Sequence, residues 1–452
     1  MRRIAILVIC AAMAASCSTV SSVGDKVWPF NKDEKKPEAS TAEKEGRISI
    51  LTFEQKLAPD DAAATETFIL PDATDVTAWP QPGGPATNSP GAIVGDGSLS
   101  IAWKRSAGSG GARRERVTAP PVIADGKIFA LDAKYNVVAL SASEGRQEWR
   151  KSLEPKKGKD KLAVGGGIAY GDGKLFVATG FGFIVALDAT TGAEVWRVTE
   201  DSPFAGAPTY DSGKVYASSN DSELFALDAN TGDLEWTYQA IAEPARVRSA
   251  PSAAVDGDLV VAPFPSGEIV ALNAGNGNRL WSDALTRAGQ LTSLSSINDI
   301  AGRPVVSNGL IIAVSQSGMI AAIDQRSGQR VWVRPLASIQ TPLVAGEYVF
   351  GVSVDSELVC IKRDTGAIRW VKQMERYENA KKKKGRVVWS GPLMIGGKLV
   401  LASSDGKVSE VDPGTGDVVR SIKIGDGVTV PPVAANQTVY LFNENADLIA
   451  LR

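Results

Sequence analysis

The stretch ALDATTGAEVW, from Ala186 to Trp196, recurs as ALDANTGDLEW from Ala226 to Trp236. Looser copies share its final tryptophan, so that one column contains Trp103, Trp149, Trp196, Trp236, Trp281, Trp332 and Trp370. The first and last of these tryptophans are 267 residues apart, a mean step of 44.5 residues. Between them, short runs of alternating apolar and polar residues are separated by Gly, Asp and Asn, which is typical of strands joined by tight turns. A repeat of this length fits one four-stranded propeller blade.

The ends of the repeat region predict how many blades there are. The 354 residues from Leu99 to Arg452 hold about eight repeats, and the last copy, from Pro432 to Arg452, lacks its fourth strand. The segment from Leu99 to Trp103 can supply that strand and so remove an exposed sheet edge. We therefore predict an all-β fold, an eight-bladed β-propeller of four-stranded antiparallel blades whose ring is closed by an N-terminal strand.

The columns of the repeat have a physical interpretation. The small residue lets blades approach, the acid accepts hydrogen bonds from turn amides, and the glycine provides a positive φ angle before the outer strand. The tryptophan then packs between blades. Cys360 stands in the small-residue column, so we expect a buried apolar side chain there; the alternative is a reactive thiol.

Composition excludes several kinds of chemistry. The chain has 452 residues and no histidine, which excludes histidine relays and histidine-ligated zinc. Its 49 Lys and Arg balance 51 Asp and Glu, so nothing suggests a nucleic-acid partner. No calcium loop of the D-x-D-x-D-G type is present. We predict no catalytic residues, no metal and no cofactor, and hence a protein that is not an enzyme.

The N-terminus has the features of an export signal. Arg2 and Arg3 precede an apolar run from Ile4 to Met13, which is too short to span a membrane. The next residues, Ala-Ala-Ser-Cys17, resemble the bacterial lipobox, in which the cysteine becomes the acylated first residue of the mature protein. The resemblance implies lipidation, including palmitate, at Cys17, and Ser18 implies sorting to the outer membrane. The alternative is an ordinary signal peptide with a chance cysteine.

Three segments follow from these observations. Residues 1–16 are the predicted signal peptide and residues 99–452 the predicted propeller. Residues 17–98, rich in Lys, Glu, Ala, Pro and Gly, cannot bury much apolar surface, so we expect a mostly flexible periplasmic tether.

The A-L-D-x-x-T-G-x-x-x-W unit resembles the tryptophan-docking repeat of the quinoprotein dehydrogenases, which would imply a calcium-held quinone in a central channel. This chain lacks the adjacent cysteines of the alcohol dehydrogenases in that group. Repeat, lipobox, tether and blade number together resemble the BamB family of outer-membrane lipoproteins, in its alphaproteobacterial version. That resemblance implies a lipid-anchored scaffold of the β-barrel assembly (BAM) complex that faces the periplasm, binds BamA and assists nascent outer-membrane proteins. A quinoprotein-type dehydrogenase and a generic envelope binding module are the alternatives.

The same resemblance implies where BamA binds. The two family stretches correspond here to residues 245–251 and 298–304, in which Arg246 and Asp299 match the family residue for residue. Arg248 lies in the first stretch, and arginine is common at interface hot spots. The alternative for these residues is a solvated loop. Lys381 to Lys384 could steer the chain toward an acidic surface, although most charge runs are simply solvated.

Overall fold

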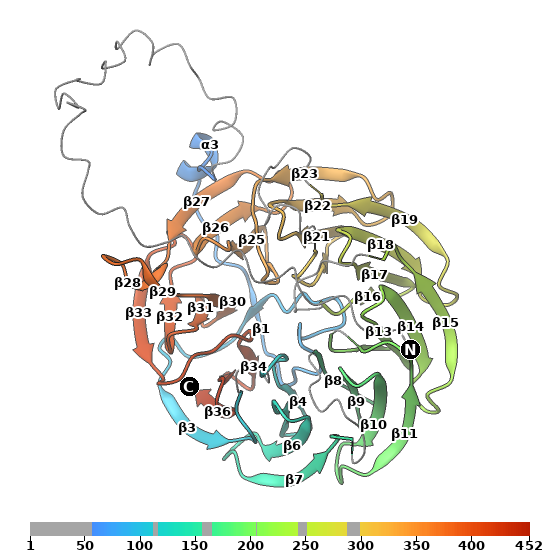
Figure 1. The fold of residues 1–452 in the computed structure, drawn as a ribbon. Coiled ribbons are helices and arrows are strands. Elements are labelled where there is room, and N and C mark those ends of the chain that lie inside the picture. Colours follow the sequence, from blue (N-terminus) through green and yellow to red (C-terminus); the bar gives the residue numbers. More distant parts are fainter. Residues whose placement is uncertain (1–56, 112–115, 156–164, 205, 243–250, 287–298) are drawn as a thin grey trace, which may run out of the picture. The chain divides into compact units, whose positions relative to one another are not determined.

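The structure is a computed structural model that describes residues 57–111, 116–155, 165–204, 206–242, 251–286 and 299–452. The chain divides into two compact units, Met1–Phe53 and Glu54–Arg452. All described residues belong to the second unit, which is built almost entirely of strands (Figure 1). None of its described helices is long and apolar enough to span a membrane.

Five consecutive repeats form antiparallel sheets of four strands each, arranged in sequence order around a central axis (Figure 1). They are β4 (Val122–Ala124), β5 (Lys127–Leu131), β6 (Asn136–Ser141) and β7 (Gln147–Ser152); β8 (Gly166–Gly171), β9 (Lys174–Thr179), β10 (Phe183–Asp188) and β11 (Glu194–Thr199); β12 (Thr209–Asp211), β13 (Lys214–Ser218), β14 (Glu223–Asp228) and β15 (Leu234–Gln239); β16 (Ala254–Asp256), β17 (Leu259–Pro263), β18 (Glu268–Asn273) and β19 (Arg279–Ala284); and β20 (Val305–Ser307), β21 (Leu310–Val314), β22 (Ile320–Asp324) and β23 (Arg330–Arg334).

Two further sheets also have four strands. One contains β24 (Leu343–Ala345), β25 (Tyr348–Val352), β26 (Glu357–Lys362) and β27 (Ile368–Gln373). The other joins the two ends of the repeat region, because β3 (Ile101–Ser106) pairs with β36 (Asp447–Leu451), followed by β35 (Thr438–Phe442) and β34 (Val433–Ala435). The strand missing from the last repeat is thus supplied from the N-terminal side, as predicted.

The remaining large sheet differs from the prediction. Its four antiparallel strands are β30 (Trp389–Ile395), β31 (Lys398–Ser403), β32 (Lys407–Val411) and β33 (Val418–Lys423). The short strands β2 (Ala92–Ile93) and β1 (Ala73–Thr74) extend it, both in parallel, to six strands. The prediction of eight four-stranded blades is therefore wrong in number: the described residues contain seven four-stranded blades, because residues from the predicted tether add to the edge of this sheet.

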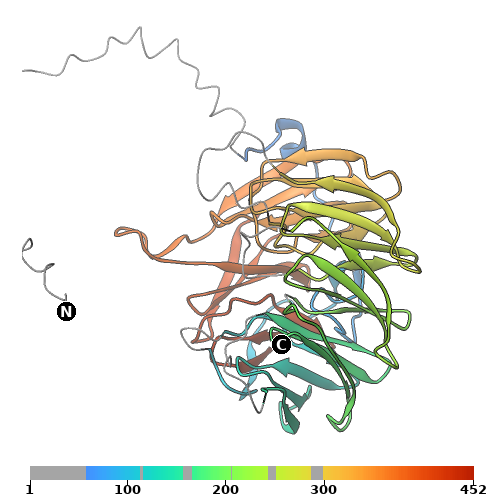
Figure 2. The ribbon, with the colours of Figure 1, turned by 45° about the vertical axis from the view of Figure 1, so that its right-hand side comes forward.

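A short hairpin leaves the body between β27 and β30. It consists of β28 (Tyr377–Asn379) and β29 (Lys384–Arg386), which pair with each other and with no other sheet. We call residues 377–386 the basic hairpin. Figure 2 shows it projecting from the side of the ring.

Tryptophan and glycine join successive sheets. In each of the seven four-stranded sheets the tryptophan lies opposite the small residue of the neighbouring strand, for example Ala226 opposite Trp236. A Cβ atom added to the turn glycine of the next sheet would lie 2.6–2.8 Å from this tryptophan, so only glycine fits. The seven contacts are Trp103–Gly145, Trp149–Gly192, Trp196–Gly232, Trp236–Gly277, Trp281–Gly328, Trp332–Gly366 and Trp370–Gly416. We call them the Trp–Gly junctions.

Hydrogen bonds complete most of these junctions. The indole Nε1 of six tryptophans donates to a carbonyl of the next sheet over 2.6–3.2 Å, as Trp236 does to Ala274. At Trp103 the equivalent carbonyl, that of Ala142, accepts from the hydroxyl of Tyr440 instead. The acid of the repeat also acts as expected: Asp188 accepts from the amides of Thr190 and Thr191, and hydrogen bonds from Thr191 lower the pKa of its carboxyl.

One sheet lacks the tryptophan. Arg420 takes its place in β33, and the residue opposite is Glu410 instead of a small residue. Glu410 is 3% exposed, and its carboxylate accepts from the backbone N–H of Leu99 at 2.9 Å. Lys398 Nζ lies 3.1 Å and Arg420 Nη1 3.9 Å from that carboxylate. We call this set of contacts, which leads to the sheet completed by β3, the Glu410 junction.

Cys360 has the position and burial that the repeat predicts. It lies opposite Trp370, is fully buried, and burial raises the pKa of its thiol to about 12. A thiol with so high a pKa is protonated at neutral pH and unreactive, as expected of a packed apolar side chain.

Candidate functional surfaces

The segment before the first repeat follows the inner edges of the sheets. We call residues 76–93 the axial strap; Figure 1 shows the light-blue chain that contains it crossing the middle of the ring. Its backbone meets the innermost strands, or the turns directly after them, through the pairs Val76–Asn436, Trp79–Ile123, Pro80–Tyr170, Ala86–Val255, Thr87–Val306 and Ile93–Gly396, with N···O distances of 2.7–3.0 Å. The prediction of a flexible tether is therefore wrong for residues 57–98, while residues 17–56 lie outside the described residues.

Three buried side chains fix the strap. Trp79 is 3% exposed and donates from Nε1 to the carbonyl of Pro82. Gln81 bonds both the N–H and the carbonyl of Tyr210 in β12, as a neighbouring strand would. Asn88 donates to the carbonyl of Pro304 at 3.0 Å. The strap thus satisfies backbone groups that the inner sheet edges would otherwise expose.

A small cavity remains beneath the strap. Its lining includes Trp79, Asn88, Arg303 and Thr341, and its volume is about 40 Å³, enough for a few water molecules. The Arg303 guanidinium donates to Thr341 Oγ1 at 3.4 Å. Burial lowers the pKa of Arg303 to about 10, which leaves it charged at neutral pH. Within the described part of the chain, no group of three or more His, Cys, Asp or Glu could hold a metal ion.

The strap is preceded by an anchor on the sheet of β24–β27. Helix α3 (Asp61–Thr65) begins after Asp60, whose N–H donates to the carbonyl of Ile368 and whose carboxylate accepts from the Ile368 N–H. Glu66 pairs with Lys362 at 2.6 Å, and its carbonyl accepts from the buried Arg369. The Lys362 ammonium lowers the pKa of the Glu66 carboxyl. The N-terminal segment therefore joins the body beside β27.

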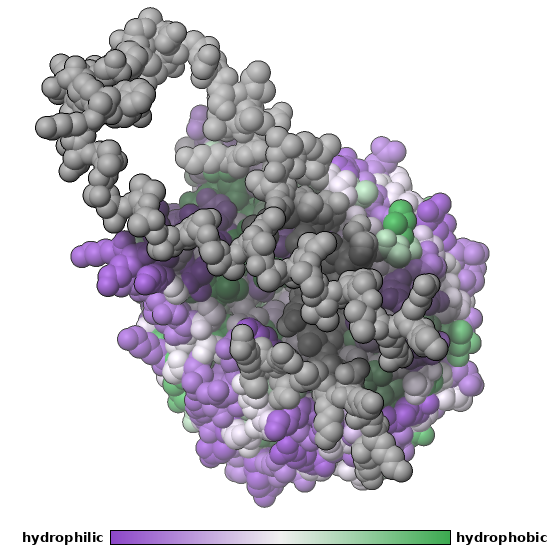
Figure 3. Space-filling model, viewed as in Figure 1, coloured by the Kyte–Doolittle hydropathy of each residue, from purple (hydrophilic) through white to green (hydrophobic). Residues whose placement is uncertain are grey.

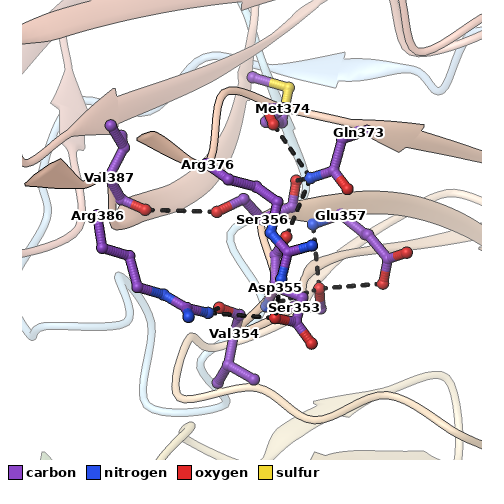
Figure 4. Close-up of polar contacts among 10 residues, drawn as sticks. All are labelled: Ser353, Val354, Asp355, Ser356, Glu357, Gln373, Met374, Arg376, Arg386 and Val387. Atoms are coloured by element: carbon purple, nitrogen blue, oxygen red, sulfur yellow. Dashed lines mark hydrogen bonds and ion pairs between the residues drawn. The ribbon is translucent and has the colours of Figure 1, made fainter. Parts of the chain in front are cut away.

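The base of the basic hairpin is held by ion pairs, shown in Figure 4. Arg376 Nη2 lies 2.5 Å and Arg386 Nη2 3.2 Å from the same carboxylate oxygen of Asp355. Arg386 also donates to the carbonyl of Val354. Asp355, in the turn between β25 and β26, thus binds both the residue directly before the hairpin and the last residue of the hairpin.

A family described as outer membrane protein assembly factor BamB has a model that matches residues 133–372, more than half of the chain. The chain belongs to the BamB family. The outer membrane protein assembly factor BamB of Escherichia coli (strain K12) is 29% identical over 341 residues, covering 74% of this chain and 84% of that protein. The protein of the same name from Shigella dysenteriae is 28% identical over 339 residues, with the same coverage.

Solved structures support the fold. BamB from Moraxella catarrhalis superposes with a TM-score of 0.66 at 21% identity, covering 78% of this chain and 100% of that one. A europium-containing methanol dehydrogenase gives the same TM-score at 15% identity, covering 83% and 98%. Because both identities are low, these likenesses show only that the chain has the propeller fold which the BamB protein and the dehydrogenase share.

The residues that the family resemblance assigned to BamA contact are placed in part. Arg246 and Arg248 lie outside the described residues, as does Cys17. Asp299 is described and only 2% exposed, and its carbonyl accepts from the N–H of Gln316. The role of all three BamA-contact residues and the lipidation of Cys17 stay predictions.

Sequence reasoning missed the strap and the hairpin base. Trp79, Gln81 and Asn88 were assigned to a tether because Pro and Gly surround them. The signal that could have revealed the strap is a lone tryptophan within a Pro- and Gly-rich run, since a large aromatic side chain seldom stays in water. Nothing in the sequence indicated the ion pairs of Asp355, because they join residues that are 21 and 31 positions apart.

Proposed function

We propose that this chain is a scaffold subunit of the outer-membrane β-barrel assembly machinery, held at the periplasmic face of the outer membrane by acylated Cys17. In this role it binds BamA and assists the insertion of outer-membrane proteins. The observation that carries the proposal is membership of the BamB family over residues 133–372. The alphaproteobacterial version of the family, suggested by the long N-terminal segment, is part of the same proposal.

A closed ring is also part of this proposal. The six-stranded sheet of β30–β33, β1 and β2 takes its place in the ring beside the seven four-stranded blades, and the pairing of β3 with β36 closes that ring. Support comes from the seven Trp–Gly junctions, which link successive sheets, and from the Glu410 junction, which links the six-stranded sheet to the segment before β3. A closed ring gives a rigid support from which loops can contact a partner.

The axial strap supports a scaffold over a quinoprotein-type dehydrogenase. A quinone in a central channel would need the space that the axial strap crosses, where the side chain of Trp79 is buried. Displacing the strap would also break its hydrogen bonds to the inner strands.

Acylation of Cys17 would favour binding to BamA by raising the local concentration of the chain at the membrane. A lipid anchor confines the chain to the membrane surface, which raises its effective concentration near a membrane-embedded partner without any new contact. Loops 245–251 and 298–304 then contact BamA, with Arg246 and Arg248 supplying charge-assisted hydrogen bonds.

Co-purification tests the proposal. We expect BamA to co-purify with the full chain after mild detergent extraction, and Arg246→Glu with Arg248→Glu to reduce BamA recovery about tenfold or more. The matched control is Arg279→Glu, an exposed arginine on β19. Because Asp299 is buried, Asp299→Asn is scored together with its melting temperature.

Two results would contradict the proposal at different levels. Absence of BamA from the recovered material would reject the scaffold function. Recovery of BamA that is equal for the Arg246 and Arg248 variant and for the Arg279 control would reject the assignment of the binding loops.

A further inference from the structure

The basic hairpin carries lysines whose charge nothing in the described structure neutralises. Between Arg376 and Arg386 the sequence RYENAKKKKGR contains six cations and one acid, Glu378. Lys381, Lys382, Lys383 and Lys384 are all exposed, and within the described residues none of these four lysines forms an ion pair. Figure 3 shows the strongly hydrophilic surface at the position of the hairpin.

The hairpin presents these lysines on an ordered support. Asp355 binds both Arg376 and Arg386 at the base, and the N–H of Val387 donates to the carbonyl of Arg376 at 3.0 Å. At the tip, the N–H of Lys382 donates to Asn379 Oδ1 at 3.0 Å. The two arginines are therefore engaged in structure, while the four lysines remain available to a partner.

The hairpin lies on the side of the body where the N-terminal segment joins it. Residues 60–66 of the anchor bond the first two residues of strand β27, and the basic hairpin begins four residues after β27 ends. In Figure 1, α3 and β28 accordingly lie near the same edge of the ring. Forty residues separate Cys17 from Leu57, which allow a reach of up to roughly 140 Å when fully extended. A membrane that holds an acyl chain on Cys17 is thus within reach of the hairpin.

The chemistry of the tip favours lipid headgroups over a protein. Protein interfaces are enriched in aromatic residues and arginine and depleted in lysine. Here the tip offers lysines, and its one aromatic residue, Tyr377, is half-buried at the base. Lysine clusters beside a membrane anchor bind anionic lipid through summed point charges.

We propose that Lys381 to Lys384 of the basic hairpin bind anionic phospholipid headgroups of the membrane in which the chain is anchored. The proposal rests on the proposed function, since the acyl chain on Cys17 brings the hairpin to the membrane. Contact at a second point fixes which side of the propeller faces the lipid, which a single flexible attachment cannot do.

A fluorescent probe at the tip tests this. The full acylated chain carrying Ala380→Cys is labelled and reconstituted in vesicles of phosphatidylcholine, or of equal parts phosphatidylcholine and phosphatidylglycerol. Cys360 stays unlabelled because it is buried. We expect a headgroup quencher to reach the probe only when phosphatidylglycerol is present, and this quenching to decrease at high salt.

Charge variants complete the experiment. Changing Lys381 to Lys384 to Gln should reduce phosphatidylglycerol-dependent quenching about tenfold or more, whereas changing them to Arg should preserve it. The control variant changes four exposed cations on other sheets or turns to Gln, and quenching of its probe should equal that of the unchanged chain. The four residues are Lys134, Arg146, Arg279 and Lys423.

Three outcomes would overturn the proposal: equal quenching in both kinds of vesicle, equal loss in the Lys and control variants, or capture by polyglutamate without lipid-dependent quenching, which would assign the lysines to an acidic protein. Failure of the proposed anchoring is a separate result, because a chain without acylated Cys17 would not remain with phosphatidylcholine vesicles at all.

Discussion

The Trp–Gly junctions and the Glu410 junction solve the same packing problem with different chemistry. At the former, an indole fills the space between sheets and a glycine admits it. At the latter, a buried carboxylate bonds a backbone amide and two cations. The Glu410 junction occurs where the six-stranded sheet meets the sheet of β34–β36 and β3. The outer strand of that sheet, β3, is preceded in the chain by Leu99 and not by the glycine turn of the repeat.

The difference shows which part of the repeat depends on connectivity. An unbroken chain supplies the turn glycine automatically after the third strand of each sheet. In the sheet completed by β3, the fourth strand comes from the N-terminal side of the repeats. The backbone N–H of Leu99, just before this strand, donates its hydrogen bond to Glu410. Glu410 replaces the small residue and Arg420 replaces the tryptophan. The two replacements belong together, because each residue compensates for the charge or volume of the other.

The largest expected effect comes from removing an indole at a Trp–Gly junction. Trp236→Ala deletes a buried side chain and its hydrogen bond to Ala274, which should lower the free energy of unfolding by about 4 kcal/mol. Trp236→Phe, which keeps most of the volume, should cost roughly half as much. Urea denaturation measures both, and equal losses would show that the indole nitrogen and not the volume matters.

A smaller loss is expected from adding one methyl group to the same kind of junction. Gly232→Ala places Cβ 2.8 Å from Trp196 at a φ of +79°, and should cost roughly 3 kcal/mol. The control is Gly213→Ala in the same sheet, with a φ of +81° but nothing within 4 Å, which should cost only about 1–2 kcal/mol of backbone strain. If the two variants unfold at the same urea concentration, the close approach to tryptophan contributes nothing.

The smallest effect is expected at the Glu410 junction. Glu410→Gln keeps the shape but removes the charge that faces Lys398 and Arg420, both partly exposed, so the loss should be about 1–2 kcal/mol. Glu235→Gln, which removes the partner of Lys214 in a more exposed ion pair, is the matched control and should cost less than about 1 kcal/mol. A Glu410 variant no less stable than this control would mean that burial of the carboxylate adds nothing to the junction.

Much of the fold was predictable because the repeat depends on interactions between residues that are close in sequence. The strands, the Trp column and the burial of Cys360 follow from alternation, turn residues and side-chain size. The six-stranded sheet was not predictable, since β1 and β2 are only two residues long and the pairing of β2 with β30 joins segments about 300 residues apart.

The candidate functional surfaces were less predictable for the same reason. Composition counts the apolar area that side chains can bury, and by that measure residues 57–98 were assigned to a tether. The axial strap is instead held largely by its backbone and by Gln81 and Asn88, which act as substitutes for backbone groups. The run of four lysines could be recognised in the sequence. The ion pairs of Asp355 that hold the base of their hairpin could not.

The route of the axial strap also bears on the order in which the protein folds. Val76 bonds Asn436, which is synthesised 360 residues later, and the strap contacts innermost strands from β4 to β34. A segment made near the start of translation must therefore wait until nearly the whole chain has been synthesised before its last partner exists. Contacts of such long sequence separation form slowly, so docking of the strap is expected to be a late step in folding.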